Sequence, residues 1–123
     1  MNRFTAVLAA AVISTGAVLA TSATAQAAPC RSGYFCVWTD ANFNGLKIEH
    51  SGDDRWWEGD MYHYDSSWAN HGVSGPGVPD HVKIYSGREL TGRVTLCLAP
   101  GQEIGYNAGA NDRGGSHTWA VGC

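Results

Sequence analysis

The side chains best suited to acid–base or metal chemistry are five histidines, and their spacing brings no two of them together. No two are four residues apart and none adjoins a cysteine pair, so a zinc-ligand pattern is missing. The chain also lacks the Gly-x-Ser-x-Gly turn that exposes a nucleophilic serine. We therefore expect a protein that is not an enzyme, with no catalytic residue and no required cofactor, and histidines at the surface. The five are His50, His63, His71, His81 and His117.

Four cysteines, Cys30, Cys36, Cys97 and Cys123, are the other reactive side chains. An even number of cysteines predicts disulfides in a small chain that is exported, as the first 27 residues indicate below. Of three pairings, we favour Cys30 with Cys36, which closes a short loop, and Cys97 with Cys123, which ties the last residue to the domain. The longer loop should contribute a few kcal/mol by restricting the unfolded chain.

Residues 1–27 have the pattern of a secretory signal peptide. Arg3 precedes an apolar stretch, and small residues follow, ending in Ala25-Gln26-Ala27. We predict cleavage after Ala27 and a secreted, extracellular protein. Without Arg3, the formal charge of −3 becomes −4 and no block of basic residues remains, so nucleic acid and membranes are not expected partners.

The remaining residues 28–123 are enough for one domain, and they repeat one pattern. An aromatic residue is followed five positions later by a large apolar residue and two positions after that by glycine. The pattern recurs after 47 residues. The two copies are Trp38, Phe43, Gly45 and Tyr85, Leu90, Gly92. In each copy a polar tip with glycine at its end predicts a hairpin that folds over.

Around these hairpins, β-favouring or alternating apolar residues predict strands and no helix of useful length. The predicted strands cover residues 33–38, 46–49, 66–68, 82–85, 94–98, 104–106 and 118–121. Residues 51–71 have no clean period and are interpreted as an irregular third strand and connection. The Gly- and Pro-rich stretch 72–79 is interpreted as the joint between the two halves.

The hairpin spacing resembles the signature of the βγ-crystallin Greek key, two of which make one domain. This resemblance implies an all-β, βγ-crystallin-like sandwich of two Greek-key motifs in a single domain. The first motif would span about residues 30–71, the linker 72–79, and the second motif about 80–123.

Crystallin-type domains that bind calcium carry two Asn or Asp residues, two variable ones, a Ser or Thr, and a Ser, because Ca²⁺ prefers several oxygen ligands. Asn111, Asp112 and Ser116 fit this pattern, but Gly115 removes one hydroxyl. The first half has Tyr62 to Ser67 at the corresponding place, without the leading acidic pair. The resemblance implies at most one weak calcium site. The alternative is that these residues form turns and satisfy buried backbone.

Large aromatic rings crowd into residues 56–68. They could form the core, as crystallin-like motifs do, or a platform for a sugar or a protein partner. We expect a core with one or two rings exposed, namely Trp56 and Tyr62.

The opening Cys30 to Cys36, the stretch Asp40 to Gly45, Leu98 to Gln102 and Asn111 to Arg113 are similar to the secreted actinobacterial peptidase inhibitors of the Streptomyces metalloproteinase inhibitor type. That resemblance implies tight binding of an extracellular, thermolysin-like zinc protease through an exposed loop. Aligning residues 93–98 with that loop would place the target bond at Cys97–Leu98. The second nearby cysteine that would close the loop is missing, and Leu98 continues the alternation of Val94 and Leu96, which favours a buried strand.

The sequence therefore predicts a secreted, monomeric peptidase inhibitor. The alternatives are a non-inhibitory extracellular module that binds calcium, a glycan or a protein, and an antimicrobial or toxin-like protein.

Overall fold

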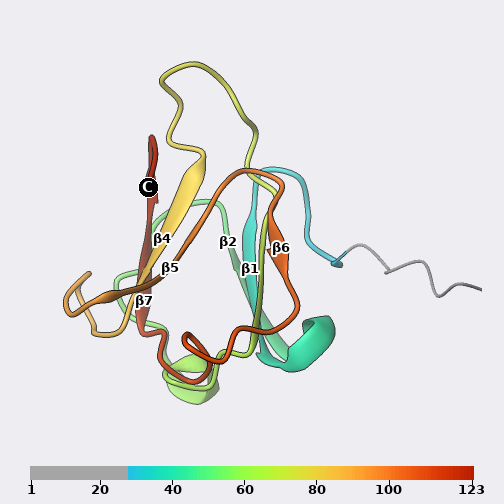
Figure 1. Ribbon diagram of the computed structural model, residues 1–123, viewed down its shortest axis with the longest axis vertical. Helices are drawn as coiled ribbons and strands as arrows, with labels where there is room; N and C mark the ends of the chain where they lie inside the picture. The colour runs from blue at the N-terminus through green and yellow to red at the C-terminus, as the bar shows by residue number, and fades with distance from the viewer. Residues whose placement is uncertain (1–27) are drawn as a thin grey trace, which may run out of the picture.

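A computed structural model describes residues 28–123, which form an all-β sandwich of two antiparallel sheets (Figure 1). Within this range no helix has the length and apolar character needed to cross a membrane. In the described part of the chain, two three-residue 3₁₀ turns, η1 (Ala41–Phe43) and η2 (Gly59–Met61), accompany the strands. The strands are β1 (Phe35–Asp40), β2 (Asn44–His50), β3 (Ser67–Asn70), β4 (His81–Tyr85), β5 (Val94–Leu98), β6 (Glu103–Ile104) and β7 (Ser116–Ala120).

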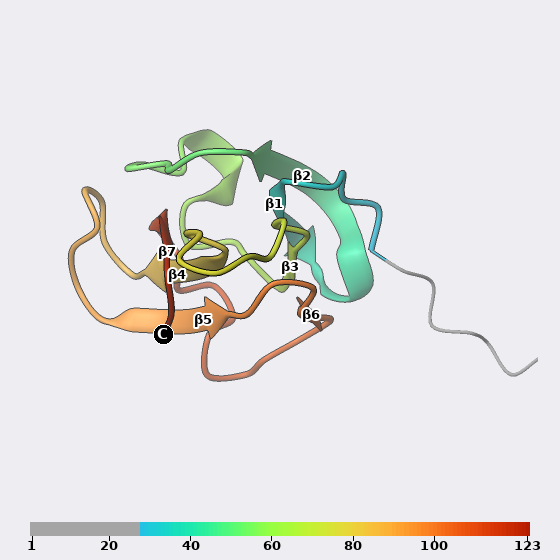
Figure 2. The same ribbon diagram turned by 90° about the horizontal axis from the view of Figure 1, so that it is seen from above.

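The two halves of the chain exchange their third strands. One sheet has the order β2-β1-β3-β6, so β6 of the second half pairs with β3 of the first. The other has the order β5-β4-β7, and Asp54 of the first half forms an isolated bridge with His117 on β7. Figure 2 shows the two sheets next to each other. The irregular third strand expected in residues 51–71 is thus reduced to one bridge, and the exchange ties the halves into one sandwich.

Both copies of the repeat fold over with the same backbone. Left-handed φ angles occur at Asn42 (56°), Phe43 (63°) and Gly45 (83°). They recur 47 residues later at Glu89 (56°), Leu90 (57°) and Gly92 (82°). Glycine is needed at the end of each tip because an added Cβ would lie 2.3 Å from Thr39 Oγ1 at Gly45 and 2.2 Å from Ser86 Oγ at Gly92. The repeat therefore encodes a backbone shape.

The main core lies between the sheets, and a second cluster lies outside the first sheet. Side chains alternate along β1, so Phe35 and Val37 face the interior with Trp57, Trp68 and Leu98. Cys36 and Trp38 face outward and are buried with Ala28 and Ala69. Residues 28–34, which we call the N-terminal strap, cover this outer face, and for that reason β1 is buried on both sides.

The disulfides join Cys30 to Cys36 and Cys97 to Cys123, the two favoured pairs. Several predicted strand limits were wrong. β3 spans Ser67–Asn70, not 66–68, and β6 spans Glu103–Ile104, not 104–106. β1 begins at Phe35 because Gly33 has a φ of 84° and donates its N–H to the carbonyl of His71. β7 spans Ser116–Ala120, not 118–121, because its register with β4 begins at Ser116 opposite Tyr85.

Candidate functional site

Leu98 cannot be an inhibitory side chain, which corrects the assignment of the target bond to Cys97–Leu98. Leu98 is fully buried in the core and pairs with Val82 across β4 and β5. Cys97 is half-buried in the same strand and bonded to Cys123. A peptidase would have to unfold this strand to reach the bond. This strand therefore offers no exposed loop to a peptidase.

The strongest candidate for a surface that binds a partner is residues 72–79, here called the linker loop. This loop projects beyond the sandwich between β3 and β4 (top of Figure 1). Its two ends are held together by Asn70, whose buried side chain reaches both. Asn70 Nδ2 donates to the carbonyls of Asp80 (2.8 Å) and Leu98 (3.0 Å). Asn70 Oδ1 accepts the N–H of Gly72 at 2.8 Å. One amide therefore fixes the base of the loop.

Asp80 braces the loop from inside. One carboxylate oxygen accepts hydrogen bonds from the Ser74 hydroxyl (3.1 Å) and the Gly75 N–H (3.4 Å), and the other lies 2.7 Å from His81 Nδ1. The hydrogen bond with His81, followed by those from Gly75 and Ser74, holds the pKa of Asp80 below its usual range. Asp80 is therefore a carboxylate at neutral pH, and the loop is organised around its charge.

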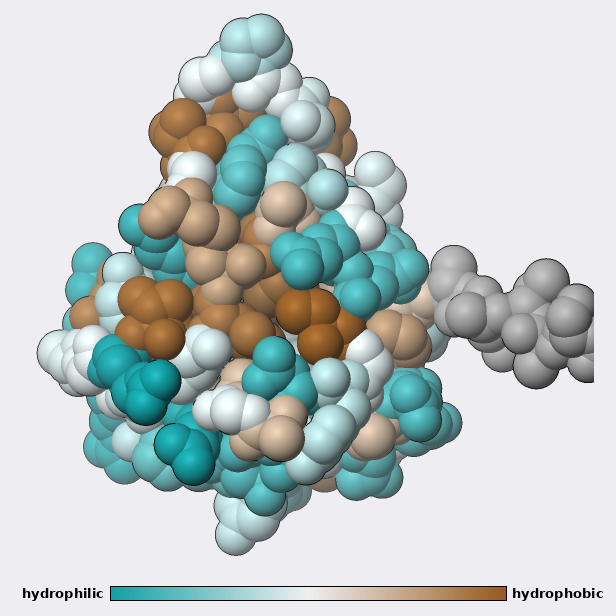
Figure 3. All heavy atoms as spheres, viewed as in Figure 1, coloured by the Kyte–Doolittle hydropathy of each residue, from teal (hydrophilic) through white to brown (hydrophobic). Residues whose placement is uncertain are grey.

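The two sides of the loop present apolar side chains to solvent. Val73 is 67% exposed and Val78 is 40% exposed. Figure 3 shows hydrophobic surface at this end of the molecule. Beside the valines lies an open groove of about 500 Å³, with Val73, Val78 and Pro79 on one side and Trp119 and Gly52 among its other walls. Gly72 is required here because an added Cβ would lie 2.6 Å from the Trp119 ring. The linker loop and the groove beside it therefore form one exposed, largely apolar surface.

Trp56 and Tyr62 come together, but around an arginine. Trp56 is 39% exposed and Tyr62 is half-buried. The Arg88 guanidinium lies 4.2 Å from the Trp56 ring centroid and 5.6 Å from that of Tyr62. These are cation–π distances. A sugar could stack on either of these ring faces only by displacing Arg88.

The residues of the calcium pattern have separate tasks. The hydroxyl of Ser116 accepts the N–H of Leu90 and donates to the carbonyl of Gly87, so it holds the second hairpin. Asp112 is exposed, whereas Asn111 Oδ1 is buried without a hydrogen-bond partner. Within residues 28–123, no three His, Cys, Asp or Glu side chains group as metal ligands. Only Asn111 and Asp112 are left for a cation.

His117 contradicts the expectation of surface histidines, because it is fully buried. Its Nδ1 accepts the Trp57 indole N–H at 2.8 Å, so Nε2 carries the proton and donates to the carbonyl of Gly52 at 3.0 Å. Burial lowers the pKa of His117 to about 4. His117 is therefore a neutral core residue at physiological pH.

Sequence reasoning missed Val73 and Val78, because their stretch was interpreted only as a joint. The available signal was two branched apolar residues inside a Gly- and Pro-rich turn segment. Exposed valines in such a segment contribute little to folding.

The fold is that of the βγ-crystallins. A βγ-crystallin from an archaeon superposes with a TM-score of 0.57 and 20% identity, covering 72% of this chain and 99% of the other. A structure that bears on the evolution of the eye-lens βγ-crystallin domain fold gives 0.59 and 16%, covering 76% and 89%. Spherulin 3A from Physarum polycephalum gives 0.53 and 16%, covering 77% and 89%. At these identities the likeness shows the fold alone.

The family is defined by sequence. The pattern of peptidase inhibitor family I36 matches residues 23–97, more than half of the chain. The chain therefore belongs to peptidase inhibitor family I36. A comparison with curated proteins finds no significant match. The match includes the whole linker loop and ends at Cys97, before Leu98. Family membership and two disulfides fit a secreted inhibitor whose partner is a protease.

Proposed function

We propose that this protein inhibits an extracellular metallopeptidase of the thermolysin-like type by binding it tightly with the linker loop. The observation that carries the proposal is the exposure of Val73 at 67% on a loop braced by Asn70 and Asp80. Family membership supports inhibition in general.

A loop of this kind suits inhibition because its shape is set before binding. Pro76 and Pro79 restrict φ within it, and Val78 donates its N–H to the carbonyl of Gly75 to close a turn. A preorganised loop loses little conformational entropy when it docks. The branched side chain of Val73 is apolar and of a size to fill a small apolar specificity pocket. The bracing also keeps the loop from relaxing if it is cleaved.

The test is a titration of the purified secreted protein against a panel containing thermolysin-like and serine peptidases. Burying one valine side chain is worth about 1.5–3 kcal/mol. Val73→Asp should therefore raise the inhibition constant for the sensitive peptidase at least about tenfold. Val78→Asp should have a smaller effect because Val78 is less exposed.

The matched control is Leu46→Asp, since Leu46 is a comparably exposed apolar residue, at 58%, on β2. It should leave the inhibition constant within about twofold. If no peptidase of the panel is inhibited, the proposal is wrong for these classes. If inhibition survives both valine changes, another surface binds the peptidase.

The second candidate function is weak calcium binding near Asn111, because Asn111 Oδ1 is buried and unpaired. An oxygen of this kind suits a hard cation, and Asp112 would add a carboxylate. Calorimetry with CaCl₂ should detect heat that Asn111→Ala abolishes, and a chelator should lower the melting temperature of the native protein only. No heat and no shift would exclude this candidate and leave inhibition untouched.

A further inference from the structure

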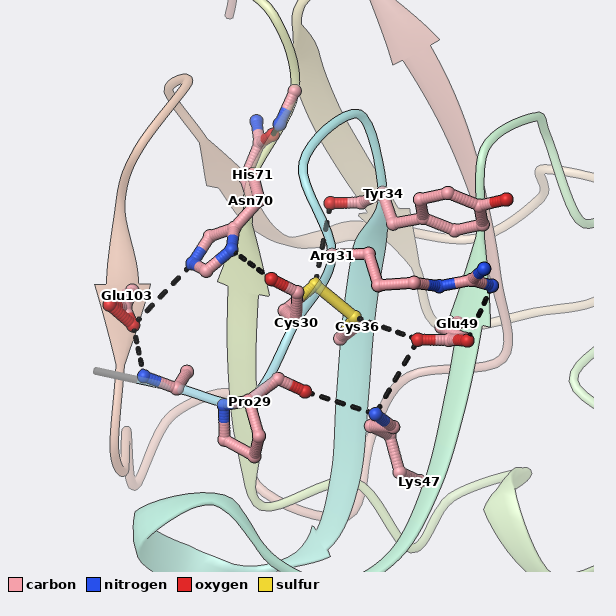
Figure 4. Close-up of a disulfide and its surroundings, with 12 residues drawn as sticks. Pro29, Cys30, Arg31, Tyr34, Cys36, Lys47, Glu49, Asn70, His71 and Glu103 are labelled. Atoms are coloured by element: carbon pink, nitrogen blue, oxygen red, sulfur yellow. Dashed lines mark hydrogen bonds and ion pairs between the residues drawn. A yellow bond between two sulfur atoms is a disulfide. The ribbon is translucent and has the colours of Figure 1, made fainter. Parts of the chain in front are cut away.

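The N-terminal strap ends at a residue that is unusually well enclosed. Ala28 is only 4% exposed and packs with Cys36, Trp38 and Ala69 on the outer face of the first sheet. Its backbone nitrogen donates to Glu103 Oε2 at 2.8 Å, the contact drawn at the left of Figure 4. Glu103 lies on β6 opposite Ala69. A carboxylate is thus placed at the nitrogen that follows the predicted cleavage site.

The rest of the strap is fixed by a polar contact at almost every residue (Figure 4). The carbonyl of Pro29 accepts from Lys47 Nζ at 3.0 Å, and that of Cys30 from His71 Nδ1 at 2.5 Å. Arg31 pairs with Glu49 at 2.7 Å. Together with the Cys30–Cys36 disulfide, these contacts hold the strap, and with it Ala28, against the first sheet.

The charge of Glu103 is poorly matched while the chain continues past Ala28. A peptide nitrogen offers one N–H and no charge. The basic side chain beside it is His71, whose Nε2 lies 3.7 Å from Glu103 Oε2. An ammonium group at the same position would offer a positive charge and further donors, and charge-assisted hydrogen bonds are roughly twice as strong as neutral ones.

We propose that removal of residues 1–27 creates this ammonium group, so that processing completes an ion pair between the Ala28 α-amino group and Glu103. Hydrolysis breaks the C–N bond between Ala27 and Ala28. The elements of water leave a carboxylate on Ala27 and a protonated amine on Ala28. The new charge then locks the strap over Trp38. Cleavage thereby stabilises the folded strap through the charge on the Ala28 nitrogen.

The experiment starts from the full chain, secreted and processed by its host, with the new N-terminus identified by mass spectrometry. We expect Ala28 as the first residue. Glu103→Gln keeps an acceptor but removes the charge, and should lower the melting temperature by about 2–6 °C. The control Glu58→Gln changes an exposed carboxylate and should shift it by no more than about 1 °C.

A two-residue Gly-Ser extension before Ala28 turns the ammonium into an amide and completes a double-mutant cycle. If the ion pair exists, the loss caused by Glu103→Gln should shrink by at least half in the extended protein. The amine of the unextended protein should also react with an acylating reagent several times faster after Glu103→Gln. A different N-terminus, additive losses in the cycle, or unchanged amine reactivity would each overturn the proposal.

Discussion

The two folded-over hairpins share their backbone but differ in what covers them. Trp38, in the first hairpin, is only 2% exposed, because Phe43 and the N-terminal strap enclose it. Tyr85, its counterpart 47 residues later, is half-buried. The second half instead carries the Cys97–Cys123 disulfide. Sequence symmetry therefore fixes the shape of each hairpin, while its stability comes from segments outside the repeat.

The largest difference in stability between the two hairpins is expected when the aromatic ring of each is removed. Trp38→Ala should cost about 3–5 kcal/mol, as for large aromatic side chains deleted from a packed site. Tyr85→Ala should cost about half of that, because less of its surface is removed from water. Urea unfolding gives both values, and Trp38→Phe, which keeps a ring, serves as the control. Equal losses would mean that the strap contributes nothing to the first hairpin.

The two disulfides should differ in the opposite sense. They close loops with sequence separations of 6 and 26 residues. In the chain-entropy model, loss of the longer one costs about 3.5 kcal/mol and loss of the shorter one about 2 kcal/mol. Replacing each pair with alanines and measuring urea unfolding compares them directly. A larger loss for the Cys30–Cys36 pair would show that its role in holding the strap outweighs loop entropy.

Lowering the pH should destabilise the second half through His117, which follows Ser116. The corresponding residue of the first half, after Ser67, is the buried Trp68, which does not titrate. An unfolded histidine takes up its proton near pH 6.5, whereas His117 in the fold does so only at about 4. The unfolded state therefore binds more protons between these values. Stability is full above pH 6.5 and falls as the pH drops through this window, by about 3 kcal/mol in total.

Urea unfolding at a series of pH values measures this loss against His117→Gln. Glutamine can still accept from Trp57 and donate to Gly52, but it does not titrate, so the variant should lack this part of the slope. His63→Asn, a change at an exposed histidine with a φ of 62° that asparagine tolerates, should keep the wild-type slope. Identical slopes for wild type and His117→Gln would show that His117 is not responsible.

The fold was predictable where a local constraint dictates it. Gly45 and Gly92 announce left-handed turns at a fixed distance from an aromatic residue, and alternation marks β4 and β5. The candidate site was not predictable, because it depends on contacts between distant segments. Asn70 braces the linker loop only because Asp80 and Leu98 meet it in the fold. His117 is buried because residues 52–57 cross over it, which no spacing in the sequence reveals.

The smallest test concerns two serines that should respond alike. Ser67 Oγ accepts the N–H of Phe43 (3.0 Å) and donates to the carbonyl of Asp40 (2.6 Å). Ser116 Oγ makes the same pair of bonds with Leu90 (3.1 Å) and Gly87 (2.6 Å). Both serines are fully buried, so replacing either by alanine leaves an amide and a carbonyl without their partner.

Each replacement should cost about 1–3 kcal/mol in urea unfolding, with the two values close to each other. Ser66→Ala, at the half-buried neighbour of Ser67, is the matched control and should cost less. Equal serine losses beside unequal losses for Trp38 and Tyr85 would separate the two contributions. The hydroxyl contacts belong to the repeated backbone, whereas ring burial belongs to the strap. Clearly unequal serine losses would mean that the strap also stabilises the hairpin backbone itself.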